Sequence, residues 1–138
     1  MHDDSDPTPV ADGPLCALIA DDNEINRIVI TEMLSHFGVR SVEAAGGEEA
    51  IALRTEHDFD LLLLDISMPN VDGPAALKAI RESEARLGLP RAPAVACTAH
   101  ALPEDAAALV ELGFDACLIK PLTLEAVADV LRATCGLP

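Results

Sequence analysis

Aromatic side chains are almost absent from this chain of 138 residues, which contains three phenylalanines and no tryptophan or tyrosine. Half of the residues are nonetheless hydrophobic, so a core has to be built from aliphatic side chains. No apolar run approaches the roughly 20 residues that cross a bilayer as a helix. A chain of this length is most simply one domain, and we expect it to make no membrane contact.

Basic residues are also scarce, with 9 lysines and arginines against 24 aspartates and glutamates and a net charge of −15. The magnitude exceeds the value of about 2–8 that is usual for a small soluble domain. Such a surface repels phosphate backbones, which argues against nucleic acid as a direct partner. Part of the excess lies in residues 1–14, a polar segment that we expect to be a flexible tail or linker, and we expect the folded domain to span 15–138.

The chain lacks a zinc-type cysteine spacing and an apolar signal-peptide segment at its start. Its four cysteines are Cys16, Cys97, Cys117 and Cys135. Three of them lie inside apolar runs, where cysteine behaves as a small buried hydrophobic residue. These features predict a reducing, cytoplasmic location.

Short apolar runs alternate with stretches of helical period, a pattern that is typical of βαβ units and a parallel sheet. The run 61–64 is the most strongly apolar and should be central, whereas 39–44 has interleaved polar residues and should lie near an edge. With right-handed crossovers, these features predict an α/β fold with a doubly wound five-stranded parallel sheet, order 2-1-3-4-5, and five helices. The expected strands are 16–20, 39–44, 61–64, 94–97 and 116–119.

The segments between the strands carry helix signals at their ends. Asp22 or Asn23 can cap the first helix, and Gly38 can end it. Thr123 can cap the last helix. The first helix places six apolar residues on one stripe: Ile25, Ile28, Val29, Met33, Leu34 and Phe37.

Polar side chains that can bind ions or take part in reactions follow the ends of four predicted strands. Asp21 and Asp22 follow the first strand, Asp65 the third, Thr98 the fourth and Lys120 the fifth. The carboxyl ends of parallel strands meet at one edge, where open α/β sheets bind ligands. Each residue alone has a structural explanation, such as a helix cap, but their conjunction predicts one site.

Three neighbouring carboxylates repel one another, and a single lysine offsets only one of their charges. A hard divalent cation resolves that conflict, and Mg²⁺ is the usual one beside phosphate. A carboxylate can also attack phosphorus to form an acyl phosphate. Asp65 is the best candidate nucleophile, because it follows the most buried strand. Lys120 and the cation would neutralise the phosphoryl oxygens, and the Thr98 hydroxyl could donate to one of them.

From about residue 16 to 133 the chain closely resembles the receiver domain of two-component response regulators. The resemblance implies a flavodoxin-like receiver fold for the domain at 15–138. The segment 21–27 looks most like receivers of hybrid histidine kinases, which pass phosphate along a relay or regulate their own kinase. The motifs that carry the resemblance are Asp21-Asp22, Leu-Asp-Ile-Ser-Met-Pro from Leu64 to Pro69, Asp72-Gly73, Thr98-Ala99 and Lys120-Pro121.

The resemblance implies that Asp65 accepts a phosphoryl group from phosphohistidine on a histidine kinase dimerisation domain, a phosphotransfer domain or the chain's own kinase core. It implies that the domain catalyses its own phosphorylation and dephosphorylation, with Thr98 and Lys120 holding the phosphoryl oxygens. The Mg²⁺ ligands would be Asp22, Asp65 and the backbone carbonyl of Ser67, with Asp21 acting through water.

Other family features also map onto this chain. The bond before Pro121 would be cis and would aim Lys120 into the pocket. Ser67 and His100 occupy places that tune hydrolysis of the acyl phosphate in the family. The docking face would combine the first helix with the loop after the fifth strand, including the exposed residues Asn26 and Arg27.

The chain departs from the family at Cys117, where members that switch by threonine–aromatic coupling carry Tyr or Phe three residues before the lysine. The rotating aromatic switch is therefore absent. We expect activation to proceed instead through Thr98 and the loop 99–103, as a population shift between two packings.

Four alternatives compete with a relay receiver. One is a single-domain response regulator that acts by protein contact. A second is a phosphohydrolase of the haloacid dehalogenase type, which needs an Asp where this chain has Ser67. A third is a flavodoxin-type binding module, whose anionic cofactor Asp21 and Asp22 would repel. A receiver fold that signals without phosphorylation is the fourth.

Overall fold

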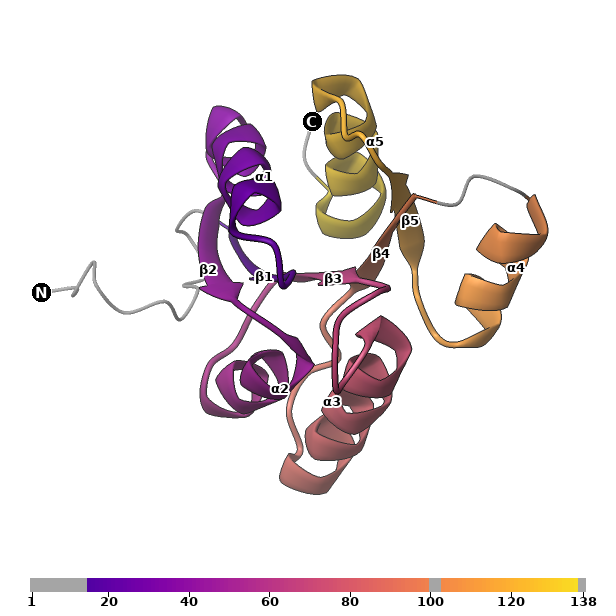
Figure 1. The fold of residues 1–138 in the computed structure, drawn as a ribbon. Coiled ribbons are helices and arrows are strands. Elements are labelled where there is room, and N and C mark those ends of the chain that lie inside the picture. The colour runs from indigo at the N-terminus through magenta and orange to yellow at the C-terminus, as the bar shows by residue number, and fades with distance from the viewer. Residues whose placement is uncertain (1–14, 100–102, 137–138) are drawn as a thin grey trace, which may run out of the picture.

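A computed structural model describes residues 15–99 and 103–136, in which strands and helices alternate. In Figure 1 the sheet forms the middle layer, with α1 and α5 on one side, α2 and α3 on the other, and α4 at the β5 end. The elements are β1 (Cys16–Ala20), α1 (Glu24–His36), β2 (Arg40–Ala44), α2 (Gly47–Glu56), β3 (Leu61–Asp65), α3 (Gly73–Leu87), β4 (Ala94–Thr98), α4 (Pro103–Glu111), β5 (Ala116–Ile119) and α5 (Leu124–Cys135).

The sheet has five parallel strands in the order β2-β1-β3-β4-β5, which confirms the predicted fold class and topology. The order reverses direction between β1 and β3. A crevice therefore forms at the carboxyl ends of these two strands, because their following helices lie on opposite faces of the sheet.

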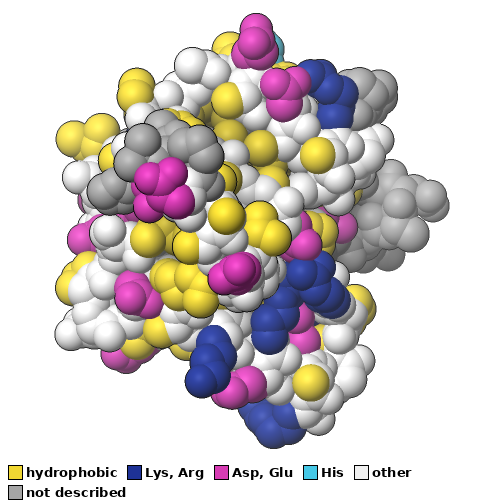
Figure 2. Space-filling model, turned by 90° about the vertical axis from the view of Figure 1, so that its right-hand side faces the viewer, with side chains coloured by type: hydrophobic (Ala, Val, Ile, Leu, Met, Phe, Trp, Pro, Cys, Tyr) yellow, Lys and Arg dark blue, Asp and Glu magenta, His cyan; other side chains and the backbone are white. Residues whose placement is uncertain are grey.

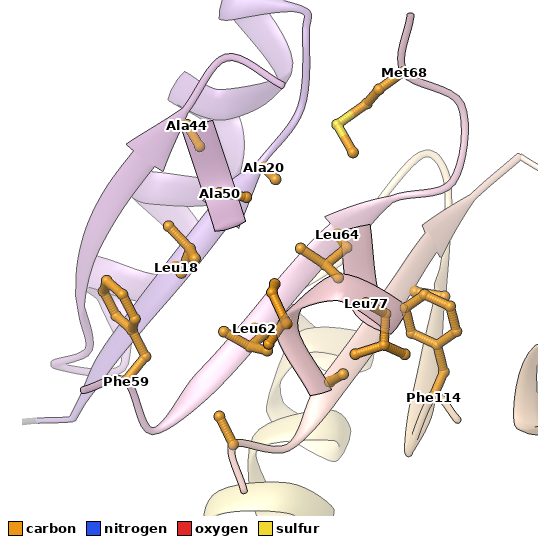
Figure 3. Packing of buried hydrophobic residues seen from close by; sticks show 14 of the residues in the cluster. Leu18, Ala20, Ala44, Ala50, Phe59, Leu62, Leu64, Met68, Leu77 and Phe114 are labelled. Atoms are coloured by element: carbon orange, nitrogen blue, oxygen red, sulfur yellow. The ribbon is translucent and has the colours of Figure 1, made fainter. Parts of the chain in front are cut away.

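Two aliphatic cores cover the two faces, since side chains alternate along each strand. Leu62 and Leu64 pack with Leu77 of α3 on one face (Figure 3), and Leu61 and Leu63 pack towards α1 and α5 on the other. Both β1 and β3 are buried throughout, as their uniformly apolar sequences predict. Each fully buried leucine contributes about 1.5–3 kcal/mol to folding, so these two strands are held firmly in the core.

The apolar stripe predicted for α1 is divided in the structure. Ile30 and Leu34 are buried against the sheet, but Ile25, Ile28 and Val29 are 70, 49 and 43% exposed. The i, i+4 pair in the second half of the helix makes the core contact. The three exposed residues point away from that buried side, because 3.6 residues complete a helical turn, and it is Asn26 and Arg27 of the first half that turn inwards.

The predicted caps are present, and they divide the roles of neighbouring residues. Asn23 caps α1 by accepting the N–H of Asn26 at 3.0 Å, so the carboxylate of Asp22 is left for other contacts. Gly38 follows α1 with a φ of +74°, a left-handed conformation that favours glycine and ends the helix. Thr123 caps α5, as predicted.

The helix α4 is held less firmly than the others. Among its described side chains only Leu109 is buried, while Val110 is 65% exposed and Leu112, just beyond the helix, is 54% exposed. Figure 2 views the molecule from this side and shows hydrophobic side chains gathered in the middle of the face. A helix with so few buried contacts opens or repacks more easily than its neighbours.

No helix within the described ranges combines the length and the apolar character needed to cross a membrane.

Candidate functional site

Four strand ends bring the predicted site residues to one edge of the sheet. Asp21 follows β1, Asp65 and Thr98 are the last residues of β3 and β4, and Lys120 follows β5. The Nζ atom of Lys120 lies 3.1 Å from Oδ1 of Asp65 and 3.4 Å from Oδ2 of Asp21, across 55 and 99 positions of sequence. The predicted convergence of these strand ends is therefore confirmed.

Asp21, Asp22 and Asp65 form an acidic cluster in which one carboxylate oxygen of each lies within 4.8 Å of the others. Asp21 and Asp65 are 1 and 6% exposed, whereas Asp22 is exposed to solvent. Three hard oxygen donors with one ammonium beside them leave an excess of negative charge. This donor set fits a divalent cation such as Mg²⁺.

Burial raises the pKa of the Asp65 carboxyl above its ordinary value, and the charge of Asp21 adds to the shift against the hydrogen bonds from Lys120 and the Ser67 N–H. Burial alone would lower the pKa of the Lys120 ammonium, but its hydrogen bond to Asp65 and the two carboxylate charges raise it. The ammonium is thus firmly charged, while the Asp65 carboxylate still lacks full compensation. An added cation would supply it.

Backbone contacts hold Asp21 in place. Its N–H donates to the carbonyl of Ala44 at the end of β2 at 3.1 Å, and its Oδ1 accepts the N–H of Asn23 at 2.8 Å. Its carbonyl oxygen accepts a hydrogen bond from Arg27 Nη1 at 2.7 Å. Asp21 is therefore bonded through its backbone and its side chain at once.

The sequence interpretation missed the role of Arg27, which it took for an exposed residue of a docking face. The side chain is only 14% exposed and also bonds Glu43 of β2 at 3.0 Å. Asn26 is half-buried as well. An arginine in the first turns of the helix after an acidic pair, with a glutamate in the adjacent strand, is the signal that could have identified this contact.

A glycine lets α3 approach the end of β3 closely. A Cβ atom on Gly73 would lie 2.5 Å from the carbonyl oxygen of Asp65, a separation that no real side chain shows. The N–H of Gly73 donates to the carbonyl of Ile66 at 3.1 Å. The loop after β3, which carries the exposed Ser67, is thereby drawn back beside Asp65.

The remaining predicted residues lie at the ends of β4 and β5. Thr98 is buried, and its carbonyl accepts the N–H of Lys120 at 2.8 Å. The peptide bond between Lys120 and Pro121 is cis, as the family resemblance implies. Cys117 is half-buried against the core beneath α2 and α3, and burial raises the pKa of its thiol. His100 and most of the following loop lie outside the described residues.

An open pocket of about 200 Å³ adjoins the acidic cluster, between the first half of α1 and the loop from β5 to α5. Lys120 contributes to both the pocket and the acidic site, so the pocket opens next to the candidate acceptor. Its lining is otherwise largely apolar, and consists of Asn26, Val29, Ile30, Lys120, Pro121 and Leu122.

Residues 17–132 match the family described as the response regulator receiver domain. The sensor protein GacS of Pseudomonas syringae pv. syringae is 36% identical over 120 residues, which cover 87% of this chain and 13% of GacS. The receiver domain of sensor histidine kinase PA1611 from Pseudomonas aeruginosa PAO1, solved with a magnesium ion coordinated in the active site cleft, is 30% identical with a TM-score of 0.79. That match covers 91% of this chain and 100% of the PA1611 chain.

A third similar structure is the complex of the Saccharomyces cerevisiae histidine phosphotransfer signalling protein Ypd1 with the receiver domain of the response regulator Ssk1. It is matched with 27% identity and a TM-score of 0.79 over 89% of this chain and 90% of that one. The chain therefore belongs to the response regulator receiver family, whose members act in two-component and phosphorelay signalling. It spans only about an eighth of the length of GacS.

Proposed function

We propose that this receiver accepts a phosphoryl group from a phosphohistidine onto a carboxylate oxygen of Asp65. The observation that carries the proposal is the Lys120 ammonium, which lies 3.1 Å from Oδ1 of Asp65 within the acidic cluster. A carboxylate alone would repel an incoming phosphoryl group, whereas a fixed ammonium stabilises the charge on its oxygens in the transition state.

The transfer is an in-line displacement at phosphorus. An Asp65 oxygen forms the new P–O bond as the N–P bond of phosphohistidine breaks, and the imidazole nitrogen leaves with the bonding electron pair. Lys120 favours the ionised carboxylate, which is the nucleophilic form. Attack by water on the resulting acyl phosphate releases inorganic phosphate and restores the carboxylate, so the domain promotes both its own phosphorylation and its own dephosphorylation.

Mg²⁺ is the proposed cofactor, because the hard oxygen donors of the acidic cluster fit it and the similar PA1611 receiver holds magnesium in its active site cleft. When bound, the cation neutralises phosphoryl oxygens. Thr98 and Lys120 would hold the remaining phosphoryl oxygens from β4 and β5. The proposed metal ligands are Asp22, Asp65 and the Ser67 carbonyl, with Asp21 acting through water.

The phosphohistidine donor would dock on α1 and the loop from β5 to α5. Ile25, Ile28 and Val29 leave an apolar face on the first half of α1, and the adjoining pocket reaches Lys120. A histidine kinase dimerisation or phosphotransfer domain could bury this face while it presents its histidine to Asp65. The structure of Ssk1 with the phosphotransfer protein Ypd1 supports a partner of that kind.

The chain would work in the cytoplasm as part of a hybrid histidine kinase, since the similar sensor proteins are much longer. A stand-alone regulator is the alternative context. Switching would start at Thr98 and repack α4, which buries a single described side chain. This route needs no aromatic residue at the place of Cys117.

Intact-mass measurement after incubation with Mg²⁺ and acetyl phosphate tests the proposal. We expect the mass to increase by one phosphoryl group. When EDTA is added before the donor, no increase should occur. The variant Asp65→Asn should gain none, and Asp58→Asn is a matched control because Asp58 is an exposed acid outside the site.

Two outcomes would count against the assignment. Equal labelling of Asp65→Asn and the wild type would place the phosphoryl group elsewhere. A chain that takes no phosphoryl group from acetyl phosphate or from any phosphohistidine donor would leave only signalling by protein contact without phosphorylation.

A further inference from the structure

The side chain of Arg27 folds back from α1 over the loop that carries the acidic pair. Its Nη1 donates to the carbonyl oxygen of Asp21 at 2.7 Å, and its Nε donates to Oε1 of Glu43 at 3.0 Å. The arginine side chain is 14% exposed and the glutamate side chain 42%. A guanidinium suits this double contact, because its donors form a rigid planar fork.

The carbonyl that Arg27 contacts belongs to the peptide group joining Asp21 to Asp22. The N–H of Asp21 donates to the carbonyl of Ala44 at 3.1 Å, and Ala44 follows Glu43 directly in β2. Both backbone groups of Asp21 are thus tied, one to the end of β2 and the other to a side chain that β2 orients. The Lys120 ammonium, by contrast, contacts Asp21 through its side-chain carboxylate.

We propose that Arg27 is a positioning residue for the metal site. By holding the peptide between Asp21 and Asp22, it sets the direction in which both carboxylates project, and Glu43 orients the guanidinium. The inference rests on the proposed function, in which these two carboxylates serve Mg²⁺. Arg27 itself would not touch the cation or the phosphoryl group.

Positioning and simple charge predict opposite effects. A guanidinium near a cation site repels the cation, so Coulomb's law alone predicts that Mg²⁺ binds more tightly once that charge is removed. If Arg27 positions the ligands, its loss lets the loop relax and Mg²⁺ binds more weakly. Removing an outer hydrogen-bond partner of a metal ligand typically weakens metal affinity about 10–100-fold, and we expect the lower end here, because Asp21 keeps its other contacts.

Mg²⁺ titration of the full chain by calorimetry, with no phosphoryl donor present, tests the inference. We expect Arg27→Gln to bind Mg²⁺ about tenfold more weakly than the wild type. Arg27→Lys should also lose affinity, since a lysine ammonium keeps the charge but not the fork. Glu43→Gln should show a smaller loss in the same direction. Melting curves recorded in EDTA show whether each variant is folded without metal at the temperature of the titration.

Arg132→Gln is the matched control, because it removes one arginine from an exposed pair with Asp129 on α5. It changes the net charge as Arg27→Gln does and should keep wild-type affinity.

Affinity in Arg27→Gln that equals or exceeds that of Arg132→Gln would overturn the inference. Full affinity in Arg27→Lys would also overturn it, since charge alone would then suffice. A wild type that binds no Mg²⁺ would overturn the proposed cofactor and the inference together. If both Arg27 variants bind Mg²⁺ with the affinity of the wild type, the inference is overturned but the proposed cofactor is not.

Discussion

Two groups of charged side chains, most of them buried, lie at opposite edges of the sheet. In one, which we call the closed group, buried charges of opposite sign are paired; in the other, the open group, negative charge is in excess. Near the amino ends of β3 and β4, Arg54 of α2 and Glu84 of α3 are 1 and 4% exposed and lie 3.1 Å apart. At the carboxyl edge, Asp21, Asp22 and Asp65 have a single ammonium between them, that of Lys120.

The closed group matches almost every charge with a hydrogen bond. The carboxylate of Glu84 accepts from Arg54, from Arg81 and from the backbone N–H of Ala92. Arg54 donates in addition to the carbonyls of His57 and Pro90. A buried ion pair is tolerated when its remaining donors and acceptors are satisfied in this way, so this group clamps α2 to α3.

The open group keeps an excess of negative charge, and burial with that excess raises the pKa of the Asp65 carboxyl. The comparison teaches that burial of charge has two distinct uses in one small domain. Where the partners balance, the charges hold helices together. Where they do not balance, an excess of negative charge is left that the proposed cation would neutralise.

The largest expected effect comes from breaking the closed group. Arg54→Ala should lower the free energy of unfolding by about 3 kcal/mol, because it removes one of the two arginines that neutralise the buried Glu84 carboxylate, while Arg81 remains beside it. Urea denaturation measures the change. The double variant Arg54→Met with Glu84→Leu should recover part of the loss, since apolar side chains of similar volume need no counter-charge, although the Ala92 N–H then loses its acceptor. If Arg54→Ala is as stable as the wild type, the contacts of Arg54 do not contribute to the free energy of unfolding.

The open group should gain stability from the cation that the closed group does not need. At a Mg²⁺ concentration a hundred times its dissociation constant, the free energy of unfolding should rise by about 2.7 kcal/mol. Thermal melting with and without Mg²⁺ measures this increment. Asp22→Asn should show a much smaller increment at the same concentration. An undiminished increment in that variant would place the cation elsewhere on the acidic surface.

The smallest expected effect is a gain in stability. In EDTA at neutral pH, Asp65→Asn should be more stable than the wild type by about 1 kcal/mol, within the range common for substitutions that relieve strain at functional sites. The neutral amide removes a buried charge that Asp21 repels. Urea denaturation compares the two proteins, with Glu56→Gln as a control at an exposed acid.

The difference in stability between Asp65→Asn and the wild type should depend on pH. The pKa of Asp65 is higher in the folded chain than its ordinary value, so the folded state holds that proton more tightly than the unfolded state. The penalty for the charged form is present above the folded pKa and is relieved as the pH falls through it. The stability gap between Asp65→Asn and the wild type should therefore narrow towards acid pH, and a gap that widens would contradict the sign of the shift.

The fold and the core of the site were predictable because both depend on order along the chain. Uniformly apolar runs mark buried parallel strands, and the residues next to their carboxyl ends must meet at one edge. Asp21, Asp65 and Lys120 were found in that way, and the structure places them within hydrogen-bonding distance. Predicting these residues required only their positions after the apolar runs, and no distance between them had to be known.

Contacts that depend on side-chain direction were not predictable. The stripe on α1 gave no sign that Ile25 and Ile28 face away from the sheet and lie exposed. Nothing in the spacing of Arg54 and Glu84 indicated that they pair across 30 residues. Arg27 was assigned to an exposed docking face by the family resemblance, and its contact with the Asp21 carbonyl appears only once α1 is docked on the sheet.

The linear order of apolar runs, glycines and acids was enough to specify a doubly wound sheet with an acidic group at its switch point, since strand periodicity and crossover handedness are local rules. Which charges are neutralised, which apolar residues stay exposed and which arginine holds the Asp21–Asp22 peptide depend on how helices dock on that sheet. Docking is a collective outcome of packing, so those contacts exist only once the tertiary structure has formed.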